Sequence, residues 1–327
     1  MSWLALWGLF GLKLLTFLLL VGAFFLMMLG ALGKAKQRLK EGQLTLKQIS
    51  ENLAEQNLAL WKETIDKKAF KLKKKALKTL QKQTKNAEKL PKLYILNFEG
   101  DLQASGADSL AKEVTAIVEI AEPGDEVLVK IESPGGVVHG YGYAASQLLR
   151  LKEKGLKLTV SVDKIAASGG YLMAVVADQL LAAPFAIIGS IGVVAQLPNF
   201  NRFLKEKGVD FEQVTAGEHK RTLSLFGENT EAGREKMKEQ LEGIHDQFKQ
   251  FIRRARPQVN LDEIATGDHW LGEEALRLSL VDELKTSDAY ILDAFHAGRA
   301  LFQIHHEQKK GLGQRFHLSL AKAFGFR

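Results

Sequence analysis

Two glycine-containing loops carry the residue types that acyl-transfer chemistry needs. The segment AASGGY places Ser168 between small residues, which leave a substrate carbonyl room to approach its hydroxyl. The N–H of Gly169 would then point at the oxyanion that forms when the hydroxyl attacks. The second loop, ESPGG, exposes the backbone N–H groups of Gly135 and Gly136, which no Cβ covers. Each loop also has a purely structural interpretation, with Ser168 as a helix N-cap and the glycines as turn formers.

A serine hydroxyl needs a base that accepts its proton. Among the eight histidines, His139 and His219 lie in the appropriate half of the chain, but their spacing singles out no Ser-His-Asp triad. Lysine is the other option, because full burial disfavours the charged amine and lowers its pKa by up to ~3–5 units. The segment around Ser168 is not the G-x-S-x-G of α/β-hydrolases. The residues alone therefore predict a serine-centred site and leave its base open.

Composition and charge exclude several other functions. The 327 residues include no cysteine, so a thiolate zinc site and a Cys nucleophile are excluded. The HExxH, Walker A and EF-hand patterns are absent, and we expect neither metal nor cofactor. Gly140, Gly142 and Ala145 imitate a dinucleotide fingerprint but begin too far beyond the strand that ends at Glu132. The formal charge of +7 is concentrated in one segment, so no nucleic-acid partner is expected.

Apolar runs alternate with helical patterns after Pro91. Strands are predicted over 93–98, 126–132 and 157–162, with helices over 107–121, 137–154 and 169–177. This alternation predicts an α/β domain with a mostly parallel sheet covered by helices.

Two further stretches need an assignment. The uncharged stretch 180–199 is interrupted by Pro184 and glycines, so we expect two short buried strands rather than a membrane span. The run 228–256 predicts a helix that is capped near Asn229 and covers the sheet. No function is assigned to the basic tail over 301–327.

The N-terminal region predicts a membrane anchor. From Leu14 to Gly33 there are 20 uncharged residues, long enough as a helix to cross about 30 Å of hydrocarbon. Trp3 and Trp7 precede this run, as in an interfacial aromatic belt. A cleaved signal peptide would need a basic start and an apolar core of about 7–15 residues, which do not fit.

Residues 34–90 follow as a basic stalk of net charge +10, whereas residues 91–327 carry −4. Apolar residues spaced by three and four predict one helix over 51–85 with a single apolar stripe. The stripe consists of Leu58, Trp61, Ile65, Ala69, Leu72, Ala76 and Leu80. The stripe either docks on the body or a sister subunit, or lies on a membrane surface. The basic charge favours lipid headgroups as the partner.

Several motifs in order resemble those of the SppA-type signal peptide peptidases. They are ESPGG, DKIAASGGY, APFAIIGSIGV, TAGEHKRT and GDHWLGEEALRLSLVDEL, spread over residues 91–290. The resemblance implies a ClpP/crotonase-like spiral of β-β-α units, preceded here by one transmembrane helix and a basic helical stalk. It also implies a Ser-Lys dyad of Ser168 and Lys220. Gly135, Gly136 and Gly169 would supply the oxyanion hole through their N–H groups.

The resemblance also implies a domain organisation. The anchor occupies 1–33, the lysine-rich stalk 34–90, the serine peptidase domain 91–300 and a basic tail 301–327.

The function expected is that of a membrane-anchored serine endopeptidase. Its substrates would be apolar, extended segments such as signal-peptide remnants or misfolded envelope proteins, and it would form a homo-oligomer. The alternatives are a catalytically idle membrane scaffold or an acyl-CoA enzyme of the crotonase type. A single pass through the bacterial inner membrane is expected. The family favours a periplasmic catalytic domain, whereas the basic flank favours the cytoplasm.

Overall fold

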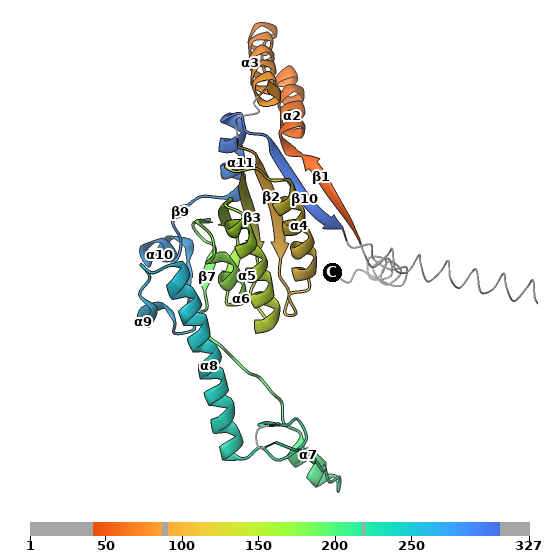
Figure 1. Ribbon diagram of the computed structural model, residues 1–327, viewed down its shortest axis with the longest axis vertical. Coiled ribbons are helices and arrows are strands. Elements are labelled where there is room, and N and C mark those ends of the chain that lie inside the picture. Colours follow the sequence, from red (N-terminus) through yellow and green to blue (C-terminus); the bar gives the residue numbers. More distant parts are fainter. Residues whose placement is uncertain (1–41, 87–90, 218–219, 308–327) are drawn as a thin grey trace, which may run out of the picture. The chain divides into compact units, whose positions relative to one another are not determined.

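The described part of the chain is an α/β structure with two sheets (Figure 1). The computed structural model describes residues 42–86, 91–217 and 220–307. Residues 46–305 form one compact unit, which holds the elements that build the site. The strands are β1 (Gln43–Gln48), β2 (Leu93–Glu99), β3 (Glu126–Glu132), β4 (Lys157–Val162), β5 (Ile165–Ala167), β6 (Gln179–Ala182), β7 (Ile187–Gly189), β8 (His269–Leu271), β9 (Glu283–Leu284) and β10 (Leu301–Glu307).

The larger sheet has the order β1-β10-β2-β3-β4-β6-β9, and its pairs from β10 to β9 are parallel. In the smaller sheet, β7 pairs with β5 in parallel and with β8 in antiparallel orientation. The predicted strands are confirmed, with β3 and β4 at their expected bounds. Apolar runs in these strands suit a parallel sheet that is covered on both faces.

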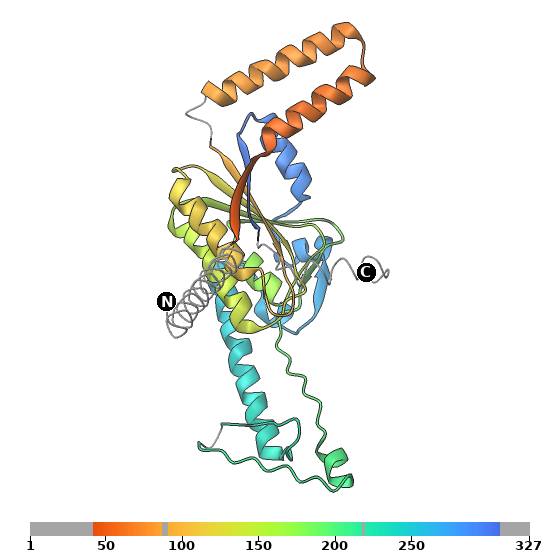
Figure 2. The same cartoon turned by 90° about the vertical axis from the view of Figure 1, so that its right-hand side faces the viewer.

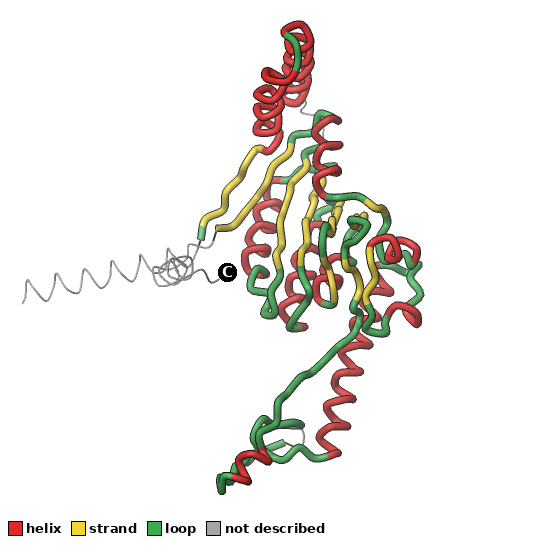
Figure 3. The backbone as a smooth tube through the Cα atoms, turned by 180° about the vertical axis from the view of Figure 1, so that it is seen from behind, coloured by secondary structure: helices red, strands yellow, loops and turns green. Residues whose placement is uncertain are grey.

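The helices are α2 (Ile49–Thr64), α3 (Lys67–Asn86), α4 (Ala107–Ile120), α5 (Val138–Glu153), α6 (Gly169–Ala174), α7 (Asn201–Glu206), α8 (Glu231–Ala255), α9 (Leu261–Ile264), α10 (Gly272–Arg277) and α11 (Ser287–His296). Successive side chains of β2 point to opposite faces of the large sheet, and helices cover both faces. Leu96 and Phe98 enter the core shared with α4, α5 and α6, whereas Leu93 and Ile95 enter a second core with α2, α3 and α11. Figure 3 views the sheet from behind, where α11 lies against the face that bears Leu93 and Ile95.

The prediction of one stalk helix over 51–85 is wrong. A strand, β1, precedes two helices, and α2 and α3 lie side by side as a hairpin (Figure 2). The chain is extended at Ile65, and Asp66 Oδ1 accepts the N–H groups of Lys68 and Ala69 at 2.7 and 3.0 Å. A short acidic side chain in that position starts a new helix. The predicted anchor over 14–33 lies outside the described residues.

The break also changes which stalk residues are buried. Leu58 and Trp61 of the predicted stripe pack into the second core, but Leu72 is 64% exposed, and Leu77 is buried instead. Within the ranges that the structure describes, no helix is both long and apolar enough to span a bilayer.

The run 180–199 behaves as predicted only in its first half. β6 and β7 are the two short strands, but beyond Gly189 the chain leaves the sheets, and Val194 is 76% exposed. Residues 193–230, which we call the arm, continue through α7 to the start of α8. The arm begins at the groove-lining Val193 and Val194 and runs to the outer end of α8, where α7 lies (Figure 1).

α8 does not cover the sheet as predicted. Among its 25 residues only Ile252 is buried. Its N-cap is Thr230, whose side chain accepts the N–H of Gly233, whereas Asn229 bonds the backbone of Ser224. The sheet also runs past residue 300, because β10 pairs in parallel with β2.

Candidate active site

Ser168 occupies a strained turn between β5 and α6. Its φ of +52° and ψ of −116° are unusual for a residue with a Cβ. The turn is held by hydrogen bonds from the N–H of Ser168 to the carbonyl of Gly189 at 2.7 Å and from Leu172 N–H to the Ser168 carbonyl at 2.9 Å. The hydroxyl makes no capping bond, although Ser168 is at the N-cap position. A strained strand-to-helix turn is also how α/β-hydrolases expose their nucleophile, although the G-x-S-x-G sequence is absent.

Gly135 and Gly169 lie directly beside that serine. Gly135 has a φ of +91°, and a Cβ there would be 2.8 Å from Cβ of Ser168 and 2.7 Å from N of Gly169. Gly169 is the first residue of α6, so its N–H has no acceptor one turn earlier in the helix. The glycines therefore leave space for a substrate oxygen in front of this N–H.

Gly135 and Gly136 differ in what their N–H groups do. The N–H of Gly135 donates to the buried Ser133 Oγ at 3.1 Å and is directed into the protein. Two residues further along the chain, the N–H of Val137 donates to the Leu102 carbonyl at 2.9 Å. Between these two engaged groups lies the N–H of Gly136, which has no acceptor among the residues that the structure describes.

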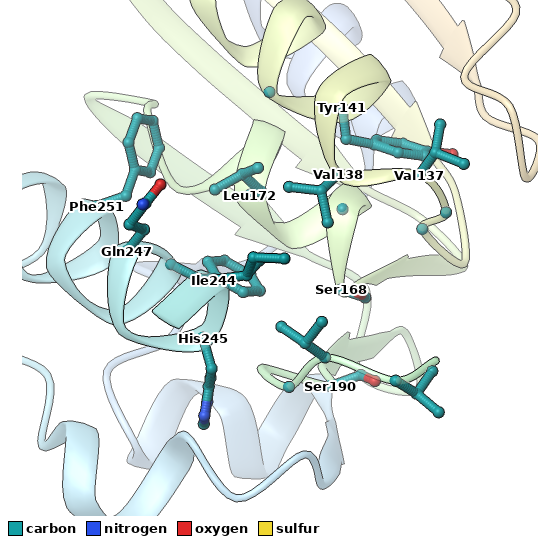
Figure 4. Close-up of a pocket in the computed structure, with 18 of the residues that line it drawn as sticks. Val137, Val138, Tyr141, Ser168, Leu172, Ser190, Ile244, His245, Gln247 and Phe251 are labelled. Carbon is teal, nitrogen blue, oxygen red and sulfur yellow. The ribbon is translucent and has the colours of Figure 1, made fainter. Parts of the chain in front are cut away.

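A groove of about 1290 Å³ surrounds Ser168 (Figure 4). Its walls are largely apolar and come from the S-P-G-G loop, α5, α6 and α8. They include Val138, Leu172, Ile244, Phe248 and Phe251. Such a groove suits an apolar, extended ligand better than a charged one.

Lys220 does not lie in this groove within one chain. It is exposed and belongs to the arm. Two residues on, the carbonyl of Thr222 packs against Gly233 in the first turn of α8. Gly233 precedes the groove residue Ile244 by eleven positions, about 17 Å along a helix axis. The structure thus brings together Ser168, Gly135, Gly136 and Gly169, and leaves Lys220 apart from them.

The two histidines considered as bases have different positions. His139 lines the groove, and His219 lies outside the described residues. His245, on α8, also lines the groove, but its Nε2 is 3.1 Å from the carbonyl of Ile191, and its ring points away from Ser168 (Figure 4). None of these contacts pairs a histidine with Ser168.

Sequence reasoning missed two contributors to the groove. Ser190 lines it, with a φ of +53° and its N–H donated to the Asp268 carbonyl at 2.6 Å. Its signal was the GSIG sequence, whose small residues suit a tight turn beside a site. The C-terminal half of α8 was interpreted as scaffold, and its periodicity offers no sign of a groove. Among the described residues, no cluster of three potential metal ligands occurs.

A strained serine beside backbone N–H donors in an apolar groove defines the class of serine hydrolases. Comparison with known proteins narrows the class. Peptidase family S49 N-terminal matches residues 2–148, and peptidase family S49 matches residues 150–298. The chain belongs to peptidase family S49 and is a serine peptidase, so the resemblance to the SppA-type family is confirmed.

Individual relatives agree with this assignment. "Probable protease SohB" of Haemophilus influenzae is 46% identical over 325 residues, which cover 95% of this chain and 91% of the relative. "Probable protease SohB" of Buchnera aphidicola subsp. Schlechtendalia chinensis is 44% identical over 297 residues, covering 88% and 97%. "Protease 4" of Haemophilus influenzae is 29% identical over 195 residues, covering 58% of this chain and 31% of the relative.

Proposed function

We propose that the protein is a membrane-anchored endopeptidase that uses Ser168 as nucleophile and Lys220 as general base. The observation that carries this proposal is the strained Ser168, whose Cβ and next N–H lie against Gly135. The neutral Lys220 amine takes the hydroxyl proton while Oγ attacks a peptide carbonyl. The ammonium then protonates the leaving amine. Water, with Lys220 again as base, hydrolyses the acyl-enzyme.

The oxyanion is held in this proposal by the N–H groups of Gly136 and Gly169. Gly135 supports the loop instead, because its N–H is donated to Ser133. Each oxyanion donor is worth about 2.7–4 kcal/mol of barrier.

Lys220 reaches Ser168 from a second copy of the chain in a homo-oligomer. Two observations support this arrangement. Lys220 belongs to the arm, and the carbonyl of Thr222, two residues on, contacts Gly233 in the first turn of α8, away from the groove. The arm also exposes apolar rings, including Phe200, Phe203 and Phe211, which a sister chain would cover. Burial in the neighbour's groove would favour the neutral form of the amine.

The substrates are apolar, extended peptide segments, as in signal-peptide remnants or misfolded envelope proteins. The apolar walls of the groove support this choice. An extended segment would add as a strand beside the small β5-β7-β8 sheet, next to Ser168.

The catalytic body, expected from the sequence over residues 91–300, is a spiral of the ClpP/crotonase type that also includes β10. Support comes from the order β4, β5, α6, in which the large sheet, the small sheet and a covering helix follow one another. A single parallel bridge between Ser133 and Ala166 joins the small sheet to the residue that follows β3.

The chain is held in the bacterial inner membrane by residues 1–33, and its catalytic body lies on the periplasmic side. The lysine-rich stalk adds contact with anionic lipid. Since the apolar side of the α2–α3 hairpin packs into the second core, lysines remain on the outside of α3. Its exposed lysines are Lys67, Lys68, Lys71, Lys73, Lys74, Lys75 and Lys78.

The test compares wild type, Ser168→Ala and Lys220→Ala, all solubilised in detergent, on an apolar fluorogenic peptide. The proposal predicts that the wild type cleaves the peptide and that both variants lose cleavage at unchanged oligomer size. Retained cleavage in Ser168→Ala would exclude Ser168 as the nucleophile. An inert wild type on a panel of apolar peptides would favour the scaffold alternative.

A further inference from the structure

Three buried groups form a hydrogen-bond chain beneath the S-P-G-G loop. The N–H of Gly135 donates to Ser133 Oγ at 3.1 Å, and Ser133 Oγ lies 2.6 Å from the hydroxyl of Tyr141. The Tyr141 hydroxyl donates to the carbonyl of Asp101 at 2.8 Å. Ser133 and Tyr141 are both 0% exposed.

The direction of every bond in this chain is determined. A carbonyl only accepts, so the single proton of Tyr141 is directed to Asp101. Ser133 must therefore donate its proton to the Tyr141 oxygen, and it accepts the Gly135 N–H with a lone pair. Burial raises the pKa of Tyr141, so its hydroxyl keeps this proton at neutral pH. The Gly135 N–H is thus held in one orientation by a relay that ends on fixed backbone.

The backbone of Ser133 also forms hydrogen bonds with β5, the strand directly before the nucleophile. The N–H of Ser133 donates to the Ile165 carbonyl at 2.8 Å, and the Ser133 carbonyl accepts from Ala167 N–H at 3.0 Å. Ile165 and Ala167 begin and end β5, directly before Ser168. Ser133 therefore links the loop of Gly135 and Gly136 to the turn of Ser168 and Gly169.

Glycines surround this relay so closely that a side chain at any of three positions would collide with it or with its backbone. A Cβ on Gly100 would collide with Ser133 Oγ and with the Tyr141 hydroxyl. A Cβ on Gly169 would collide with the Tyr141 ring, and one on Gly170 would lie 2.6 Å from the Ser133 carbonyl. The ring of Tyr141 thus supports the backbone of Gly169, while its hydroxyl supports the opposite loop.

We propose that Ser133 and Tyr141 are positioning residues that hold the two oxyanion donors, Gly136 N–H and Gly169 N–H, at a fixed separation. The inference rests on the proposed Ser168 chemistry and adds to it the residues that preorganise the oxyanion hole. Without the relay, the loop loses the bond that fixes Gly135, and Gly136 moves with it. A donor displaced by about 1 Å costs roughly 100-fold in rate.

The experiment uses the full-length enzyme with Ser133→Ala, Tyr141→Phe and the double variant. Neither change removes a ring or a Cβ, so packing against Gly169 is retained. Tyr171→Phe is the matched control, because Tyr171 is equally buried on α6 and donates its hydroxyl to the Leu280 carbonyl at 3.0 Å. For each variant we would measure kcat, KM, the melting temperature and inhibition by a peptide aldehyde, whose adduct places an oxygen in the oxyanion hole.

We expect kcat to fall about 10- to 100-fold in either single variant, with KM changed less than about twofold. Aldehyde inhibition should weaken in parallel. The double variant should resemble the worse single variant, since both residues act through one relay. Tyr171→Phe should lower the melting temperature and leave kcat unchanged.

Wild-type kcat in both folded single variants would overturn the inference, as would an equal loss in Tyr171→Phe. If Ser133→Ala fails to fold, the isosteric Tyr141→Phe decides alone. Failure of the proposed function would look different, because Ser168→Ala would then keep cleaving or the wild type would not cleave at all.

Discussion

Gly135 lies so close to Ser168 that a methyl group on Gly135 would be 2.8 Å from the serine Cβ. The same methyl group would be 2.7 Å from the nitrogen of Gly169. Two loops that are 33 residues apart in the chain therefore enclose one small space in front of the serine. In our account, this space receives the carbonyl oxygen of the scissile peptide bond.

Filling this space should abolish activity. We expect Gly135→Ala to lower kcat at least about 100-fold, because its methyl group blocks the Gly169 N–H. Gly124→Ala is the matched control, since Gly124 has a φ of +92° and open space around its Cβ position. Both variants place a Cβ at nearly the same positive φ, but Gly124→Ala should lose only stability. Equal kcat values for the two variants would contradict the assignment of the space.

A dyad shared between copies predicts complementation. Ser168→Ala and Lys220→Ala chains should each be inactive. When they are dissociated and reassembled together at a 1:1 ratio, about a quarter of the sites should regain both residues. Recovered peptide cleavage would be measured against each variant reassembled alone.

Lys220→Arg alone should be inactive, because guanidinium stays protonated. The double variant Ser168→Ala/Lys220→Arg supplies neither residue of the dyad, so it should restore nothing when it is reassembled with Lys220→Ala. A mixture of Ser168→Ala and Lys220→Ala that stays inert, although mixed oligomers form, would contradict the shared dyad.

The lysines of α3 should respond to lipid charge. In nanodiscs with anionic lipid, hydrogen exchange of α3 in the full-length chain should be slower than in neutral nanodiscs, since each lysine gains about 1 kcal/mol near an anionic surface. Replacing Lys71, Lys74, Lys75 and Lys78 by Gln, or adding 0.5 M salt (a Debye length of about 4 Å), should remove the difference. Equal exchange of wild-type α3 in both nanodiscs would exclude this contact.

Glu126 should make the fold sensitive to acid. Burial raises the pKa of its carboxyl, but hydrogen bonds from Thr159, Tyr290 and Arg299 outweigh burial and bring the pKa below its usual range. A lowered pKa in the folded state stabilises the fold above the unfolded pKa of about 4.3, and this contribution is lost as pH falls through the folded value.

The free energy of unfolding should therefore fall more steeply below about pH 4 in wild type than in Glu126→Gln. Denaturant titrations at pH 3 to 7 measure the difference. Glu122→Gln, at an exposed carboxylate paired with Lys92 at 3.8 Å, should follow the wild-type curve. Identical acid dependence in all three proteins would refute the role of Glu126.

The features of this structure that the sequence predicts are those determined by residues close together in the chain. The strands β3 and β4 were predicted at their bounds because buried parallel strands are continuous apolar runs. The loops of Ser168 and Gly135 were found because consecutive glycines leave backbone N–H groups uncovered by any Cβ, next to a serine among small residues. The break at Asp66 was missed because a stripe at three- and four-residue spacing continues across it, although an aspartate before Lys67 was a start signal.

Other features depend on residues far apart in the chain. The choice between Gly135 and Gly136 as oxyanion donor depends on Ser133, Tyr141 and the Asp101 carbonyl, which no local pattern connects. The position of Lys220 away from its own groove follows from the length of α8 and the course of the arm. Neither the choice of oxyanion donor nor the position of Lys220 could be derived from the spacing of residues in the sequence.

Labelling of Ser168 tests the central claim most directly. The full-length chain in detergent would be treated with a fluorophosphonate, digested and mapped by mass spectrometry, with peptide cleavage followed in parallel. We predict one modified serine, Ser168, and loss of cleavage in proportion to the label. Inactivation with the label on another residue, or undiminished cleavage after complete modification of Ser168, would contradict the account.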